Sequence, residues 1–142
     1  MDITYSSKTA LTRSKPSRPI KWLLSECLVK GRTLDYGCGH GFDADHYGFD
    51  KYDPFYFPKP PTGEYHTIVS NYVANTLLVY DLKDYLLDIK RLLKPKGSAY
   101  ITVRRDIISQ GKTSRGYQFN HNLNLKSIKL LKNNYEIYIM NK

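Results

Sequence analysis

The stretch TLDYGCGHGFDADHYGFDKYDP, residues 33–54, decides the fold that we predict for this chain. It begins with residues suited to a buried strand, passes through glycines at positions 37, 39 and 41, and ends on an aspartate before a proline. A Cβ at such glycines would keep a ligand away from the backbone of a strand-to-helix turn. The pattern predicts a strand at 32–37, a turn that holds a small molecule, and a short helix at about 42–47.

Three kinds of ligand-binding turn compete for this pattern. A phosphate-binding P-loop needs a lysine followed by serine or threonine, and none follows these glycines. A dinucleotide turn has its third glycine at position 42, where Phe42 stands, and Gly41 comes one place early. The spacing is instead DxGxGxG from Asp35. The third candidate is a turn that binds S-adenosylmethionine (SAM).

Length and composition indicate a small globular protein. The 142 residues suit one domain, and no apolar run approaches the ~20 residues that cross a bilayer. The N-terminal region lacks the apolar segment of a secretory signal, so we expect a cytoplasmic protein without membrane association. Cys27 and Cys38 are too few for a disulfide framework, and no cysteine or histidine pair has zinc-ligand spacing. We therefore predict no metal site.

The net charge of +9 comes from 22 basic and 13 acidic residues. This balance favours polyanionic partners such as nucleic acid, although dispersed basic residues also suit an ordinary solvated surface. The oligomeric state does not follow from the sequence.

Residues 1–18 are polar and without periodicity, which predicts a flexible or loosely docked N-terminal arm. Residues 19–142 are expected to form a single domain. Its first helix is predicted to begin at Pro19 and to stop at Gly31. The apolar face of this helix consists of Ile20, Leu23, Leu24, Cys27 and Leu28.

Strands and helices are predicted to alternate through the rest of the chain. The prolines of residues 54–64 indicate a loop. The short apolar pattern of residues 65–73 predicts a strand. A helix capped by Asp81 leads through KPKG to a strand at 98–103 and a polar stretch at 104–122. Leu125, Ile128 and Leu131 suggest a further helix, before a closing strand at 135–140. This alternation favours an α/β sheet with parallel neighbours.

The chain resembles class I SAM-dependent methyltransferases in four segments that stand in the right order. Residues 34–41 match the LDxGCGxG motif of that family, and GFDKYDP resembles the end of its second strand. YHTIVSNYVANTL resembles its fourth-strand motif, and LLKPKGSAYITV resembles its LKPGG segment. The resemblance implies a minimal Rossmann-like, mostly parallel sheet whose region between the glycine turn and the fourth-strand motif is shortened.

A narrower similarity is to DNA phosphorothioation-associated methyltransferases. The motifs that carry it are DYGCGHG, YDPFYFP, NYVAN, VRRD and TSRGYQ.

The resemblance implies SAM as the cofactor. The implied cofactor-binding residues are Asp35, Tyr36, Gly37, Cys38, Gly39, Gly41, Asp53, Pro54, Asn71 and Tyr72. A carboxylate accepts paired hydrogen bonds from vicinal ribose hydroxyls, and Asp53 is predicted to do so, with Asp50 as the alternative. Because no room remains for the usual third strand, the rings of residues 55–57 either cover the adenine or close the core.

Catalytic residues are hard to predict because the SAM methyl is already activated, so positioning dominates. The candidates near the expected methyl position are His40, Asn71, Tyr72 and Asn75. The segment at 70–73 lacks the proline pair of enzymes that methylate exocyclic base amines. Arg104, Arg105 and Arg115, which follow the strand at 98–103, are predicted to bind an anionic substrate, and Tyr117 and Gln118 are candidates to line the same mouth.

These features predict a SAM-dependent methyltransferase with an unidentified, anionic acceptor, either a small molecule or nucleic acid. One alternative is an enzyme that consumes SAM without an external acceptor. The other is a basic nucleic-acid-binding module that keeps the fold without transfer. Product analysis with SAM alone distinguishes the first alternative, and cofactor binding distinguishes the second.

Overall fold

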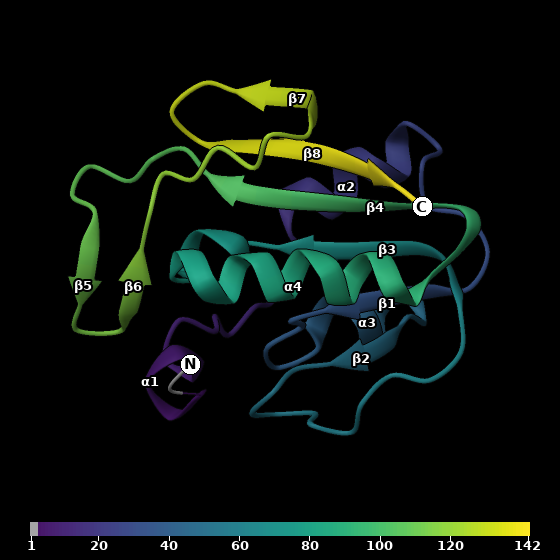
Figure 1. Ribbon diagram of the computed structural model, residues 1–142, viewed down its shortest axis with the longest axis horizontal. Helices are drawn as coiled ribbons and strands as arrows, with labels where there is room; N and C mark the ends of the chain where they lie inside the picture. Colours follow the sequence, from purple (N-terminus) through teal and green to yellow (C-terminus); the bar gives the residue numbers. More distant parts are fainter. Residues whose placement is uncertain (1–2) are drawn as a thin grey trace.

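A six-stranded sheet forms the centre of the computed structural model, which describes residues 3–142 (Figure 1). The spatial order is β2-β1-β3-β4-β8-β7. These strands are β1 (Thr33–Tyr36), β2 (Asp50–Tyr52), β3 (Tyr65–Asn71), β4 (Leu93–Arg104), β7 (Lys126–Leu131) and β8 (Tyr135–Asn141). Neighbours from β2 to β4 are parallel, whereas β8 is antiparallel to both β4 and β7. The predicted α/β class with a mostly parallel sheet is confirmed.

Helices cover both faces of the sheet (Figure 1). On one face, α4 (Val79–Leu92) buries Tyr85, Ile89 and Leu92 in a core with β1, β3 and β4. On the other face, α2 (Arg18–Ser25) buries Ile20 and Leu23. The short α3 (Phe42–Tyr47) lies on that second face beside β1, where left-handed Gly41 and Gly48 flank it. No helix within residues 3–142 is long and apolar enough to cross a membrane.

Two predicted helix ends differ from the structure. The helix α2 stops at Ser25 rather than at Gly31, because Cys27 takes a left-handed conformation with φ 56°. The helix α4 begins at Val79, so Asp81 lies in its first turn, where a negative charge still favours the helix dipole. The strand after it, β4, starts at Leu93 rather than at residue 98.

The helix predicted around Leu125, Ile128 and Leu131 is wrong, because residues 126–131 form β7. In a regular strand, residues three apart point to opposite faces. Here the pairing with β8 shifts register between Ser127 and Lys129, and both Ile128 and Leu131 pack on the α2 side of the sheet. A bulge thus reproduces the spacing of a helix within a strand.

The polar stretch at 104–122 contains a hairpin that the sequence did not predict. Its strands β5 (Gly111–Thr113) and β6 (Gly116–Gln118) form a separate antiparallel pair beyond the end of β4 (Figure 1). The 3-10 helix η1 (Ala74–Thr76) holds the hairpin to the domain, because the Phe119 amide donates to the Asn75 carbonyl at 2.7 Å.

The N-terminal arm contacts the domain at both of its ends. Its helix α1 (Ile3–Ser7) packs beside β6, and the Tyr5 hydroxyl donates to the Thr113 carbonyl. Arg115 Nε donates to the Lys8 carbonyl at 3.1 Å. At the other end, Ser17 donates to Asp43 through its amide and its hydroxyl, at 2.9 and 2.6 Å.

The pair of Arg105 and Glu136 yields a prediction about stability. Their side chains are 18% and 14% exposed, with Arg105 also donating to the His121 carbonyl and the Tyr138 hydroxyl. Arg105→Ala leaves a largely buried carboxylate unpaired and should lower the free energy of unfolding by ~3 kcal/mol in denaturant titration. The exposed pair Arg91–Asp88 is the control, where Arg91→Ala should cost less than ~1 kcal/mol. Equal effects of the two substitutions would contradict this account.

Candidate functional site

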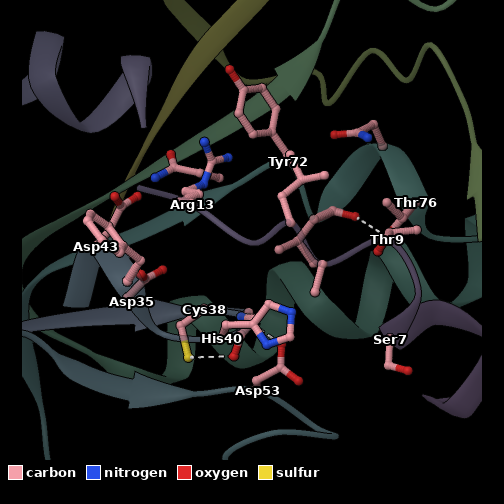
Figure 2. Close-up of a pocket in the computed structure, with 18 of the residues that line it drawn as sticks. Ser7, Thr9, Arg13, Asp35, Cys38, His40, Asp43, Asp53, Tyr72 and Thr76 are labelled. Carbon is pink, nitrogen blue, oxygen red and sulfur yellow. Dashed lines mark hydrogen bonds between the residues drawn. The ribbon is translucent and has the colours of Figure 1, made fainter. Parts of the chain in front are cut away.

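The parallel strands β1, β3 and β4 end at one edge of the sheet, where a cavity of about 520 Å³ opens (Figure 2). That volume lies within the ~300–1,000 Å³ of small-molecule sites, and open α/β sheets bind ligands at this edge. The glycine turn, the ends of β3 and β4, the loop after β2 and the N-terminal arm all contribute to its walls.

The glycine turn adopts the backbone that its sequence suggests. Gly37, Gly39 and Gly41 have φ of 79°, 55° and 84°, which glycine adopts more readily than other residues. A Cβ on Gly37 would stand 2.4 Å from Val73 Cγ2, and one on Gly41 would stand 2.8 Å from Lys51 Cδ. The turn therefore also lets β3 and β2 approach closely.

Four amides of this turn are already hydrogen-bonded. Those of Gly37 and Cys38 donate to the Tyr52 carbonyl, at 2.7 and 3.0 Å, and that of Gly41 donates to the Cys38 carbonyl at 2.9 Å. The Gly39 amide donates to Asp53 Oδ2 at 2.9 Å. A phosphate-binding turn presents such amides to its ligand, so this arrangement agrees with the exclusion of a P-loop.

Asp35 is the central ionisable group of the cavity. Only 4% of the residue is exposed, and its carboxyl has no hydrogen bond among the described residues. Burial, followed by the charges of Asp43 and Asp53, raises its pKa to about 8, against the opposing influence of Arg13. A carboxyl that faces a cavity without a partner favours a cationic ligand there.

The two neighbouring carboxylates are engaged within the protein. Asp43 accepts both hydrogen bonds of Ser17. Asp53 accepts three amide hydrogen bonds, from Gly39 to Oδ2 and from Phe55 and Tyr56 to Oδ1 at 2.9 and 3.0 Å. A carboxylate offers about four acceptor positions, so Asp53 keeps about one for a ligand. This differs from the predicted paired recognition of two hydroxyls.

Asp50, the alternative ribose-binding acid, lies away from the cavity. It starts β2, at the opposite end of the strand from the glycine turn, and pairs with Arg32 at 3.0 Å. The Tyr65 hydroxyl also donates to it at 2.8 Å. Of the two acids, the cavity is lined by Asp53.

The end of β3 and the following η1 bring three predicted catalytic candidates to the cavity. Both polar side-chain atoms of Asn71 are buried without a partner among the described residues. Tyr72 has φ 64°, an uncommon conformation for a non-glycine residue and one that clusters at functional sites. The side chain of Asn75 is fully buried and donates to Gln118 Oε1 at 2.9 Å, so it holds the hairpin.

The remaining predicted residues divide into two groups. His40 lies at the exposed rim, with its ring 4.4 Å from that of Tyr56, and Cys38 and Pro54 also line the cavity. Burial raises the pKa of the Cys38 thiol, which keeps it protonated at neutral pH. Tyr36 does not line the cavity, because its hydroxyl donates to Asp88 Oδ2 at 2.6 Å on the α4 side.

The three predicted substrate-binding arginines lie in different places. Arg104 lines the cavity, where both ends of its guanidinium bind Asp106, at 2.7 and 3.1 Å. Arg105 points away from the cavity into its pair with Glu136, and Arg115 binds the arm through Lys8. The substrate-binding role expected for Arg105 and Arg115 does not agree with these positions.

The N-terminal arm supplies lining residues that sequence reasoning missed. Ser7, Thr9, Ala10, Leu11, Arg13 and Arg18 all line the cavity. A polar segment with no periodicity carries no signal that it folds over a distant turn, so these positions could not be found from spacing.

Comparisons with known proteins relate the chain to others by its fold. No protein-family description matches it, and no curated protein matches its sequence significantly. A solved structure titled as the conversion of a disulfide bond into a thioacetal group during echinomycin biosynthesis has a TM-score of 0.59 at 13% identity, over 90% of this chain and 82% of that one. At this identity the likeness shows a shared fold alone.

Two further solved structures resemble the chain more distantly, each at 13% identity. An O-methyltransferase family protein from Burkholderia thailandensis has a TM-score of 0.46, over 82% of this chain and 45% of that one. A SAM-dependent methyltransferase from Clostridium acetobutylicum has a TM-score of 0.47, over 98% and 67%. TM-scores below 0.5 support no conclusion about this chain.

The raised pKa of Asp35 predicts how stability depends on pH. The folded protein binds this proton more tightly than the unfolded chain, whose aspartate titrates near 3.8, so stability falls as pH rises from about 4 to about 8. Asp35→Asn removes the group that loses its proton. The variant should unfold at a higher temperature than the wild type at pH 8.5, with a smaller difference at pH 5, in thermal scans. A variant less stable at pH 8.5 would contradict this assignment.

Proposed function

We propose that this protein binds SAM in the cavity and is a SAM-dependent methyltransferase. The observation that supports this best is Asp35, a buried and unpartnered acid beside a glycine turn in a cavity of about 520 Å³. SAM carries a permanent sulfonium cation and an ammonium group, so it suits such an acid. When bound, it would supply a methyl group already activated for transfer.

The residues around Asp35 fit the rest of this cofactor. The acceptor position left on Asp53 Oδ2 suits one ribose hydroxyl. The ring of Phe55 is 46% exposed and lines the cavity, so among the predicted aromatic rings it is the one placed to cover an adenine. The rings of Tyr56 and Phe57 instead contact His40 and Lys51.

At the end of β3, Asn71 and Tyr72 are proposed to orient the acceptor. The buried amide of Asn71 offers one donor and one acceptor group that the described residues leave unused. Burial raises the pKa of Tyr72 to about 12, so its hydroxyl stays protonated at neutral pH and acts as a hydrogen-bond donor, not as a base. Positioning and exclusion of water are the contributions that such residues make.

The acceptor is proposed to be anionic, either a small molecule or nucleic acid. The net charge of +9 favours it, and Arg18 and Arg104 line the cavity. Because Asp106 already binds Arg104, an anion there would have to replace that carboxylate. The motifs YDPFYFP, NYVAN and VRRD support the narrower proposal that the chain is one of the DNA phosphorothioation-associated methyltransferases.

Calorimetric titration with SAM tests the proposed binding. We expect micromolar or tighter binding, weakened about tenfold or more by Asp35→Asn. Asp35→Asn is also expected to unfold at a higher temperature than the wild type at pH 8.5. Weakened binding by this variant would therefore reflect a lost ligand contact and not a folding defect. Undetectable binding by the folded wild type would overturn the proposed function.

The pH dependence of this binding has a defined sign. Because the ligand favours the ionised form of Asp35, affinity should rise about tenfold per pH unit below the pKa of about 8. The rise should level off near pH 8, where the α-amino group of the ligand also loses its proton. Asp35→Asn should abolish the rise of SAM affinity with pH below about 8. An unchanged rise in that variant would show that Asp35 is not the titrating group.

Product analysis distinguishes transfer from the alternatives. Incubation with SAM alone should leave the cofactor intact if an acceptor is required. Breakdown of SAM without an acceptor would replace the methyltransferase by a SAM-consuming enzyme.

A further inference from the structure

The N-terminal arm lies across the cavity and is attached on both sides of it. The Tyr5–Thr113 and Arg115–Lys8 contacts attach one end to the β5–β6 hairpin, and the Ser17–Asp43 contact attaches the other end to α3. Between them the arm comes close to the glycine turn, because a Cβ on Gly39 would stand 3.2 Å from that of Ala10. The arm thus forms part of the cavity wall.

Arg13 is the cationic side chain that this segment brings to the acidic part of the cavity. Figure 2 shows it on the same side of the cavity as Asp35 and Asp43. Its guanidinium carbon lies 6.0 Å from the centroid of the Tyr72 ring. No hydrogen bond or ion pair joins the Arg13 side chain to another described residue, whereas Arg104 and Arg105 are each paired with a carboxylate. Its donors remain available to a ligand.

An unpaired guanidinium near an unpaired carboxyl suits a ligand that carries both charges. An α-amino acid has an ammonium and a carboxylate on the same carbon, and arginine binds a carboxylate through two parallel hydrogen bonds. Asp43 and Asp53 are less suited to the ammonium, since Ser17 occupies about half of the acceptor positions of Asp43 and backbone amides occupy three of about four on Asp53. Arg18 also lines the cavity, but Arg13 is the cation whose charge acts on Asp35. The unpaired carboxyl and the guanidinium beside it are therefore those of Asp35 and Arg13.

We infer that Arg13 binds the carboxylate of an amino-acid group whose ammonium lies at Asp35, and that residues 8–17 of the arm close over ligands that carry both groups. This inference rests on the proposed function, because it assigns the amino-acid end of SAM. It adds a binding residue from a segment whose sequence indicates only a polar arm. It also makes the ligand carboxylate the group that couples binding to closure of the arm.

The test compares SAM with decarboxylated SAM, which differs only in the carboxylate. In calorimetric titrations the wild type should bind SAM about tenfold or more tightly than decarboxylated SAM. Arg13→Gln should reduce that preference to less than about threefold, and measurable binding of decarboxylated SAM by this variant shows that it is folded. Lys15→Gln removes the same charge from an exposed position of the arm that does not line the cavity, and it should keep the full preference.

Hydrogen exchange reports the arm itself. Amides within residues 8–17 of the wild type should be protected by SAM and not by decarboxylated SAM, and Arg13→Gln should lose this protection. If Arg13→Gln keeps the preference for SAM, or if both ligands protect the arm equally, the inference is wrong and the proposed function stands. If the wild type binds neither ligand, the proposed function itself fails.

Discussion

The candidate site is organised around a buried carboxyl that the described residues leave without a partner. Asp35 lies one residue before the end of the central strand β1, lines the cavity and receives no hydrogen bond from a described residue. Such a group destabilises the folded chain, and its two acidic neighbours increase the effect. A cationic ligand beside Asp35 would offset this cost, and the cavity, the arm and the proposed cofactor all meet at that carboxyl.

The surrounding fold fixes this carboxyl in place. On the α4 side of the sheet, the Tyr85 hydroxyl donates to Ser70 Oγ, which donates to the Tyr36 carbonyl, each at 2.6 Å. On the other side, Asp43 and Asp53 organise the arm and the loop after β2 by accepting hydrogen bonds from Ser17 and from loop amides. Asp43 and Asp53 thus stabilise local structure, whereas Asp35 is left to contact the proposed ligand.

The sequence predicts the glycine turn, α3 and the loop after β2, because each depends on local patterns of glycine, proline and apolar residues. It also predicts parallel neighbours in the sheet, because helices and strands alternate along the chain. It misassigns β7, where a bulge produces a helical spacing, and it misses the hairpin, whose short strands have almost no apolar pattern. It cannot distinguish Arg104 from Arg105, because adjacent positions on a strand point to opposite sides of the sheet. The contribution of the arm depends on contacts across more than a hundred residues, as between Tyr5 and Thr113.

A carbon NMR titration of the Asp35 carboxyl, assigned by comparison with Asp35→Asn, reads out directly whether this group holds its proton in the free protein. We expect a midpoint near 8 in the free protein and an ionised carboxylate at pH 7 when SAM is bound. A midpoint near the ordinary value of about 4, unchanged by SAM, would contradict this expectation.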